Sequence, residues 1–307
     1  MILTVCMSPS IDVTIEVDSL NIGKTNVAKS KSILFGGKAL NVAVGVKRLN
    51  GESHATGIMY TENGYMFENA LKKENVPFSF VYSDGRVREN YKFIDNRAML
   101  TEVNGVSSEV SKAKADEVLQ KVAELSKKAE VTVLSGSIPR GLDDRYYGQL
   151  AKAVDKNSLK IVDAHGLRLF SAMGVGADLV KPNLEELENT IGRQIASKED
   201  MLSACHELLN RGAKRVLLSL GKQGAVITDG MRNYYCKSIH VAVNSTVGAG
   251  DGMVAAASLM LKDDAPLSEV LRSSVAAGTA TVMTVGQVSF TKEKYDEVLS
   301  TLRVIEI

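Results

Sequence analysis

The sequence predicts an α/β protein with a mainly parallel central sheet and a second, smaller β-sheet that projects from it. Two patterns in its 307 residues lead to this prediction. From about residue 110 onward, short apolar runs alternate with amphipathic helical segments, which is typical of a parallel sheet covered on both faces. Two other stretches, about 11–35 and 86–104, alternate apolar and polar residues with no helix between them, which indicates half-exposed antiparallel strands.

The first element expected is a strand, because residues 1–6 form an apolar run too short for a signal peptide. A helix should follow Gly37, since apolar residues recur at helical spacing from Ala39 to Leu49. Later patterns predict helices over about 112–128, 143–154, 198–211 and 252–261, and strands over about 131–134, 160–163, 178–181, 215–220 and 225–228. We expect residues 1–10, 36–85 and 105–307 to form the core, and residues 11–35 and 86–104 to form a lid or a dimer surface.

The composition is that of an ordinary globular protein, with 45% hydrophobic residues, 24% charged residues and a formal net charge of +1. That charge gives no field to attract nucleic acid or an anionic membrane, and the chain contains no Trp to stack on bases. The sequence has no run of about 20 apolar residues that could span a bilayer. Cys6, Cys205 and Cys236 are widely spaced, which predicts neither disulfides nor a zinc site and favours a reducing cytoplasm.

The strongest chemical signal is the segment 244–251, Asn-Ser-Thr-Val-Gly-Ala-Gly-Asp, which leads into the helix expected over 252–261. Outward-pointing N–H groups and the helix dipole favour an anion at a helix N-terminus, and Gly248 and Gly250 let the backbone approach it. The natural ligand is a phosphate. Asp251 could take a proton from a hydroxyl that attacks this phosphate, which suggests phosphoryl transfer to an alcohol. The alternative is that Asp251 only caps the helix.

Single residues exclude two commoner nucleotide-binding loops. The dinucleotide pattern G-x-G-x-x-G would need glycine at position 253, where the chain has Met253. The Walker pattern G-x-x-x-x-G-K-[ST] nearly fits at Gly23-Lys24-Thr25, but it would need glycine in place of Asp18. A nucleotide bound by this chain would therefore use neither loop.

Several polar residues at other turns suit a polyol or a phosphate ligand. Gly36, Gly37, Lys38 and Asn41 lie at the start of the helix expected after the first apolar–polar stretch, where backbone N–H groups and a cation would converge. The alternative there is a tight turn with a solvated lysine. Asp12 follows the first strand, where a carboxylate could accept hydrogen bonds from sugar hydroxyls, unless it is simply a surface residue.

Other candidates lie farther along the chain. Arg88, on the projecting sheet, could clamp a sugar phosphate, although solvated strand charges are common. Asn183 and Glu186, three positions apart after a strand, could help hold Mg²⁺, form a capping box, or do both. The glycine pattern from Ser219 to Gly224 could let the backbone pass over a nucleotide, or could be a plain hairpin turn.

Taken in chain order, these motifs resemble those of the ribokinase-like carbohydrate kinases of the phosphofructokinase-B family. The matching segments are Asp12, Gly36-Gly37-Lys38-x-x-Asn41, Gly85-Arg86-x-Arg88, Ser135-Gly-Ser137-Ile-Pro139, Lys181-Pro-Asn183-x-x-Glu186, Ser219-Leu-Gly221-x-x-Gly224 and Thr246-Val-Gly-Ala-Gly-Asp251. The resemblance extends over essentially the whole chain. It implies a three-layer α/β/α core with a mainly parallel sheet and a small β lid, through which two subunits would form a homodimer.

The resemblance also implies roles for individual residues. Asp251 would be the general base, and the backbone at Gly248, Ala249 and Gly250 would form an anion hole. The sugar and its phosphate would be held by Asp12, Gly36, Gly37, Lys38, Asn41, Arg88, Ser137 and Arg140. ATP would lie against Lys181, Ser219, Leu220, Gly221, Lys222, Gln223, Gly224 and Gly250, while Asn183 and Glu186 would organise Mg²⁺.

The branch of the family most resembled phosphorylates fructose 1-phosphate with ATP to give fructose 1,6-bisphosphate. Phosphorylation of tagatose 6-phosphate to tagatose 1,6-bisphosphate is the nearest alternative. An alternative of another class is a regulator that binds a sugar phosphate without turnover, against which the intact Gly-Ala-Gly turn and Asp251 argue. The expected partners are thus small molecules, a sugar phosphate and ATP, rather than nucleic acid or a membrane.

Overall fold

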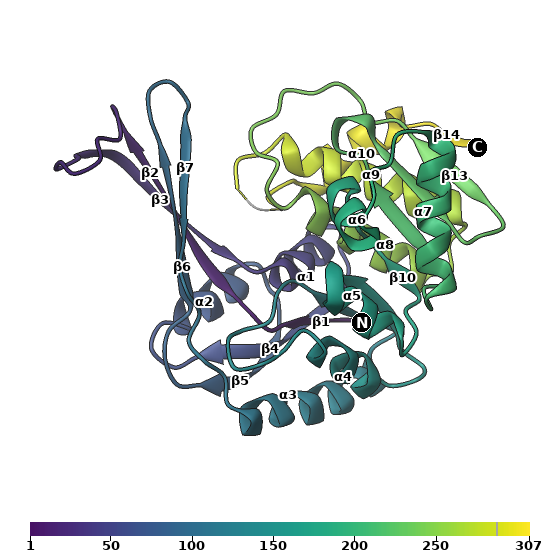
Figure 1. Cartoon of the computed structure of the whole chain (residues 1–307), viewed down its shortest axis with the longest axis horizontal. Helices are drawn as coiled ribbons and strands as arrows, with labels where there is room; N and C mark the ends of the chain where they lie inside the picture. The colour runs from purple at the N-terminus through teal and green to yellow at the C-terminus, as the bar shows by residue number, and fades with distance from the viewer. Residues whose placement is uncertain (287) are drawn as a thin grey trace.

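A ten-stranded sheet forms the centre of the molecule in the computed structural model, which describes residues 1–286 and 288–307 (Figure 1). All strands from β11 to β5 run parallel, which confirms the predicted mainly parallel sheet, and β12, β13 and β14 extend it in antiparallel fashion. The order across the sheet is β14 (Val304–Glu306), β13 (Asn233–Cys236), β12 (Ala225–Thr228), β11 (Val216–Ser219), β10 (Leu179–Val180), β9 (Leu159–Asp163), β8 (Val131–Ser135), β1 (Ile2–Cys6), β4 (Ser53–Tyr60) and β5 (Phe78–Ser83).

Helices cover both faces of this sheet. Successive side chains of a strand point to opposite faces, and both faces are apolar here, so each needs a layer of helices. In β1, for example, Leu3 joins one hydrophobic core and Ile2 joins another. The first core is completed by α2 (Tyr65–Lys73), α3 (Lys112–Leu125), α4 (Tyr146–Ala153), α5 (Gly166–Met173), α6 (Leu184–Ile191) and α7 (Lys198–Asn210). The second is completed by α8 (Ala249–Lys262), α9 (Leu267–Val282) and α10 (Lys292–Thr301), and α1 (Lys38–Arg48) contributes to both.

A separate four-stranded sheet stands clear of the main body at the left of Figure 1. Its order is β3 (Ala28–Gly36), β2 (Ser10–Val17), β6 (Arg88–Ile94) and β7 (Leu100–Asn104). The prediction of purely antiparallel strands was wrong in one respect, since β2 and β6 at its centre pair in parallel. The physical reason is that the chain leaves the core twice from the same edge, so that each outgoing strand runs in the same direction.

The two faces of the small sheet differ in character. Side chains in register with Asp12, such as Asn90 and Asn104, share one face, whereas those in register with Val13, such as Ile33 and Val103, share the other. The Asp12 face is turned toward a cavity described below, so the apolar face is turned away from it. On that outer face, Ile33 is 40% exposed and Val103 is 55% exposed.

The close packing of α1 on α8 depends on a glycine. A Cβ atom added at Gly45 would lie 2.8 Å from the Cβ of Ala255, which is closer than two carbon atoms can pack. We expect Gly45→Val to lower the free energy of unfolding by about 3 kcal/mol, the upper end for overpacking a core. Denaturant unfolding measures this, with Lys47→Val as a control that puts the same residue on the same helix. If Gly45→Val lowered the free energy of unfolding no more than Lys47→Val does, α1 and α8 would not need a glycine at this contact.

Candidate active site between two cavities at the edge of the sheet

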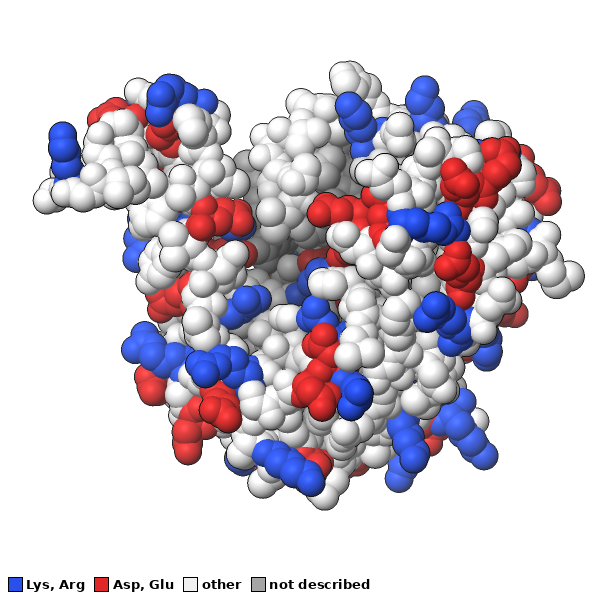
Figure 2. All heavy atoms as spheres, viewed as in Figure 1, with Lys and Arg blue, Asp and Glu red and all other residues white. Residues whose placement is uncertain are grey.

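Two adjoining cavities lie beyond the carboxyl ends of the parallel strands, where ligands bind in open α/β sheets. The first, of about 530 Å³, lies between the small sheet and the core and is lined by residues such as Asp12, Lys38 and Asp251. The second, of about 840 Å³, lies between the β11–β12 turn and helices α8 and α9. Asn183, Ser219 and Gly250 line both cavities, so the two ligand spaces meet at the start of α8. Figure 2 shows the surface hollowed between the small sheet and the rest of the molecule.

The glycine-rich turn begins α8 as the sequence predicts. Gly248 occupies the N-cap position with φ 85°, a left-handed conformation that glycine adopts without strain, and no side chain caps this helix end. The Ala249 N–H donates to the Thr246 carbonyl over a long 3.4 Å, whereas the Gly250 N–H has no backbone partner among the described residues and is available to a ligand. The alternative of Asp251 as an N-cap is wrong, because Asp251 lies within the first turn and bonds elsewhere.

Asp251 is buried, with 6% of its surface exposed, and its Oδ2 accepts a hydrogen bond of 2.7 Å from Asn41 Nδ2 on α1. Burial, and then the nearby Asp163 carboxylate, raise the pKa of Asp251 to about 7, although Lys38, Asn41 and Lys181 act in the opposite direction. A carboxyl group with that pKa is poised to exchange a proton near neutral pH.

Asp163 is the main site residue that the sequence analysis missed. It ends β9, is 1% exposed, and lies 3.2 Å from Lys181 Nζ and 3.5 Å from Lys38 Nζ. Burial alone would raise its pKa, but the Lys181 and Lys38 ammonium groups lower it to about 2. The same carboxylate raises the pKa of Lys38 above its ordinary value despite partial burial, so Asp163 and Lys38 form a charged pair. The available signal was its position, an aspartate at the carboxyl end of a predicted strand.

The residues predicted to hold the sugar come together only in part. Asp12, Gly37, Lys38, Asn41, Arg88 and Ser137 line the first cavity. Asp12 does not directly follow the first strand as expected, because β2 begins at Ser10 and carries it in the small sheet. There its Oδ1 accepts a 2.8 Å hydrogen bond from Asn90 Nδ2. Arg88 Nε is buried and has no hydrogen-bond partner among the described residues, as expected for a donor that awaits a ligand.

Other predicted residues lie away from these two cavities. Arg140 is exposed, and its backbone N–H instead donates to Ser107 Oγ in a surface loop. Gly36 is buried at the end of β3 and does not line the first cavity, because the strand turns away there. Leu220 and Gln223 line neither of the two cavities, because they face a separate cavity that Tyr235 and Ile307 also line.

The second cavity has a glycine-rich rim and an apolar interior. Ser219, Gly221, Lys222 and Gly224 line it from the hairpin turn between β11 and β12, so the turn alternative and the ligand-lining position coexist. Lys181, predicted to contact ATP, lines the first cavity rather than this one, with Nζ 3.2 Å from where a Cβ on Gly250 would be. The apolar wall, which the motifs did not identify, is formed by residues such as Ile239, Val241, Met253, Val275 and Val282.

The predicted metal residues form the capping box that the sequence allowed. Asn183 Oδ1 accepts from the Glu186 N–H at 2.7 Å, and Glu186 Oε2 accepts from the Asn183 N–H at 2.9 Å. Glu186 Oε1 lies 3.5 Å from Lys38 Nζ. Among the described residues, no cluster of His, Cys, Asp and Glu could hold a metal ion by itself. This pair of oxygen donors fits Mg²⁺, which binds through few protein ligands and keeps water and phosphate oxygens.

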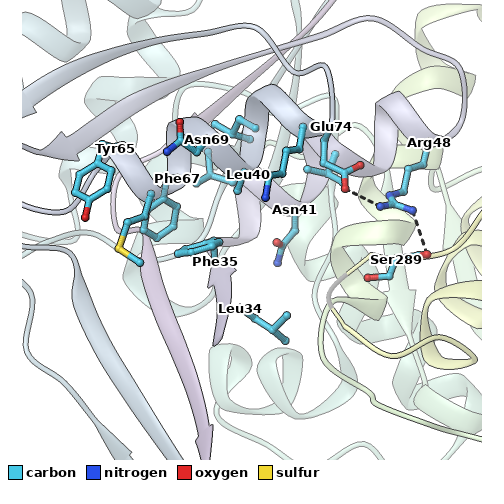
Figure 3. Close-up of a pocket in the computed structure, with 15 residues that line it drawn as sticks. Leu34, Phe35, Leu40, Asn41, Arg48, Tyr65, Phe67, Asn69, Glu74 and Ser289 are labelled. Atoms are coloured by element: carbon cyan, nitrogen blue, oxygen red, sulfur yellow. Dashed lines mark hydrogen bonds and ion pairs between the residues drawn. The ribbon is translucent and has the colours of Figure 1, made fainter. Parts of the chain in front are cut away.

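A third cavity, of about 480 Å³, lies behind Asn41 and is shown in Figure 3. It is lined mainly by apolar side chains, including those of Leu34, Phe35 and Phe67. Arg48 at its edge donates to Glu74 at 2.7 Å and to the Ser289 carbonyl at 3.1 Å. Arg48 and Glu74 thus neutralise each other and leave no charge directed at a ligand in this cavity. The reactive groups converge in the first cavity instead.

The surface of the molecule carries charges of both signs. Lys and Arg side chains are interspersed with Asp and Glu over the face shown in Figure 2, as expected for a chain with a net charge of +1. Within residues 1–286 and 288–307, none of the helices combines the length and apolar character needed to cross a bilayer.

Comparison with known proteins supports this geometry. D-tagatose-1-phosphate kinase of Bacillus licheniformis is 31% identical over 311 residues, covering 100% of both chains. The 1-phosphofructokinase of Bacillus subtilis is 30% identical over 303 residues, covering 97% of this chain and 98% of the relative. The tetrameric inhibited form of phosphofructokinase-2 from Escherichia coli has the same fold, with a TM-score of 0.87, 29% identity and coverage of 97% and 98%. The pfkB family carbohydrate kinase pattern matches residues 3–294, and the chain therefore belongs to this family of carbohydrate kinases.

Proposed function

We propose that this chain transfers a phosphoryl group from ATP to fructose 1-phosphate and forms fructose 1,6-bisphosphate. The observation that carries the proposal is the position of Asp251 in the polar cavity, directly after Gly250, which lines both the polar and the apolar cavity. The two Bacillus relatives described above are named for ketohexose 1-phosphates, which supports a 1-phosphate substrate. Tagatose 6-phosphate remains the alternative, since a Staphylococcus epidermidis relative of 25% identity is named tagatose-6-phosphate kinase.

In this proposal, Asp251 accepts the proton of the attacking sugar hydroxyl. The hydrogen bond from Asn41 occupies Oδ2 and fixes the carboxylate plane, so Oδ1 is the oxygen that receives the proton. The first-turn N–H groups at Ala249 and Gly250 stabilise the charge on the transferring phosphoryl. Lys181, with its ammonium group beside Gly250, adds a positive charge at the same place. Positioning and charge neutralisation are what phosphoryl transfer mainly requires.

The existing phosphate of the sugar would lie between the small sheet and the core. Arg88 and Lys38 supply the cations, and Ser137 supplies a hydroxyl at the same cavity. Asp12 and Asn41 would bind the sugar hydroxyls, with the small sheet, residues 11–35 and 86–104, acting as a lid. ATP would occupy the second cavity, with its adenine against the apolar wall. When bound, Mg²⁺ would neutralise phosphate oxygens, and Asn183 and Glu186 are the residues that would hold it or its waters.

An ADP-release assay over a panel of free and phosphorylated hexoses tests this proposal. We expect the highest kcat/KM for fructose 1-phosphate, because Arg88 and Lys38 require a phosphate that free hexoses lack. A higher value for tagatose 6-phosphate would support the alternative sugar. Binding of sugar phosphates without ADP release would instead identify a regulator without turnover.

The first prediction for the site concerns the proposed base. We expect Asp251→Asn to reduce kcat by about 10²–10⁴-fold, the usual contribution of general-base catalysis, while sugar and ATP binding change only a few-fold. Steady-state kinetics and calorimetric titration measure the two effects. A variant that kept a tenth of the activity would exclude Asp251 as the base.

The pH profile gives a second reading of the same residue. Because a general base acts only when ionised, kcat/KM should rise through about pH 7, the pKa of Asp251, and level off above it. The residual activity of Asp251→Asn should lack this acidic limb. If kcat/KM of Asp251→Asn still rose through the same pH range, a group other than Asp251 would be responsible for the profile.

A second prediction concerns the phosphate of the sugar. Loss of a charged hydrogen bond costs about 1.5–3 kcal/mol, so Arg88→Ala should raise KM for fructose 1-phosphate about tenfold or more. KM for ATP should stay nearly unchanged. Arg86→Ala is a matched control, since Arg86 is exposed and pairs with Glu62 and Glu89 outside the cavity. Equal effects of Arg88→Ala on both substrates would place Arg88 outside the sugar site.

A third prediction concerns assembly. We propose a homodimer joined through the small sheet, because its outer face exposes Ile33 and Val103 and an apolar sheet face favours a cover. A relative that forms a tetramer supports oligomers in the family. Light scattering should give a mass near twice 33.0 kDa.

Val103→Asp should shift that mass toward the single chain, whereas Val106→Asp, on the exposed loop after β7, should not. Crosslinks between subunits should involve Lys29 or Lys31 on β3. A single-chain mass at micromolar concentration, with full activity, would leave the small sheet as a lid that works alone.

A further inference from the structure

We infer that Asp163 is a positioning residue for the phosphoryl transfer, whose buried carboxylate holds the ammonium groups of Lys38 and Lys181 in place along the first cavity. The inference rests on the kinase activity of the family and not on which hexose phosphate is the substrate. Asp163 would act through these lysines rather than by touching the sugar.

The carboxylate of Asp163 is itself held firmly. It lies at the last position of β9, in register with Ser135 at the end of β8. Ser135 Oγ donates to its Oδ2 at 3.0 Å, and the Asp163 carbonyl accepts from the Gly136 N–H at 3.1 Å. With only 1% of the residue exposed, the carboxylate cannot turn toward water. A fixed negative charge therefore lies in the wall of the first cavity, beside both lysines.

The buried ammonium group of Lys181 pairs with the Asp163 carboxylate. The residue is 3% exposed, so its ammonium group needs a counter-charge, and Asp163 Oδ1 lies 3.2 Å away. The backbone N–H of Lys181 donates to the Val162 carbonyl at 3.1 Å, which fixes the start of the side chain on the adjoining strand. The side chain then crosses to the start of α8, with Nζ beside Gly250. Asp163 thus aims a cation at the anion-binding turn.

Lys38 is held more loosely, which suits a group that must also reach a phosphate. Its Nζ lies 3.5 Å from both Asp163 Oδ2 and Glu186 Oε1, and 38% of its side chain is exposed. The two carboxylates share the ammonium group at ion-pair distance. A phosphate that enters the first cavity can therefore attract Lys38 while Asp163 keeps it on the correct side.

A double-mutant cycle with Asp163→Asn and Lys181→Met tests this link, using the hexose phosphate that the protein turns over fastest. We expect each single variant to lose about 100-fold in kcat, and the double variant to be within about threefold of the worse single variant, because residues that act as a unit are not additive. Losses that multiply would overturn the inference. Recovery of Asp163→Asn by excess Mg²⁺ would also overturn it, since Asp163 would then be a metal residue.

A matched control exists at the start of the adjoining strand, β10. Asp178 precedes β10, its Oδ1 pairs with Lys214 Nζ at 2.8 Å, and it lines neither of the two cavities. Asp178→Asn should keep kcat within about threefold of the original, as expected for a residue without a part in the chemistry. If Asp178→Asn lost as much kcat as Asp163→Asn, the effect of Asp163→Asn would be a general effect of breaking an ion pair at the end of a strand, and the inference would be wrong.

A pH profile and a second variant distinguish a positioning role of Asp163 from a purely structural one. The acidic limb of kcat/KM should move to lower pH in Asp163→Asn, because a negative charge near Asp251 is removed while Lys38 and Lys181 remain. Cys6, the other titratable group facing Asp251, has its pKa raised to about 12 by burial and stays neutral. An acidic limb of kcat/KM at unchanged pH would count against the inference.

If Asp163→Asn does not fold, Ser135→Ala replaces it in the double-mutant cycle, with the same non-additivity expected.

Discussion

The hydrogen bond between Asn41 and Asp251 joins the first turns of α1 and α8, and the arrangement of the site depends on it. The two residues are 210 positions apart in the chain. They meet because α1 and α8 pack closely where Gly45 faces Ala255. The positive ends of two helix dipoles are thereby aimed at one place. A buried carboxylate is costly, and the amide of Asn41 with these dipoles makes it tolerable.

Around this bond, buried charges of opposite sign are placed in alternation. Asp163 lies between Lys38 and Lys181, and Glu186 lies on the far side of Lys38. In the absence of substrates, the ammonium groups are balanced by carboxylates rather than by water. Phosphate groups of the substrates can then replace these carboxylates as partners without leaving a bare charge in a desolvated site. This local balance explains how a chain with a net charge of +1 can bind two phosphorylated ligands.

The small sheet adds a boundary that the core cannot supply. Because β2 and β6 both leave the core from the same edge, their polar side chains fall on one face, which carries Asp12 and Arg88 to the first cavity. The opposite face is apolar and only partly covered, since Val103 is 55% exposed. One sheet thus serves two surfaces, because side chains of a strand alternate with a period of two.

The sequence by itself determined the elements, the mainly parallel sheet and the glycine-rich turn with Asp251, because these depend on local periodicity and on short-range backbone chemistry. It also predicted that Asp12, Lys38, Asn41 and Arg88 would converge. Only the tertiary structure decided the parallel pairing of β2 with β6, the exclusion of Arg140 and Gln223 from the cavities, and the central position of Asp163. Those features depend on which strand ends meet across the sheet and on which side of a turn a side chain points. No local pattern encodes such distances, because they arise from the packing of segments far apart in the chain.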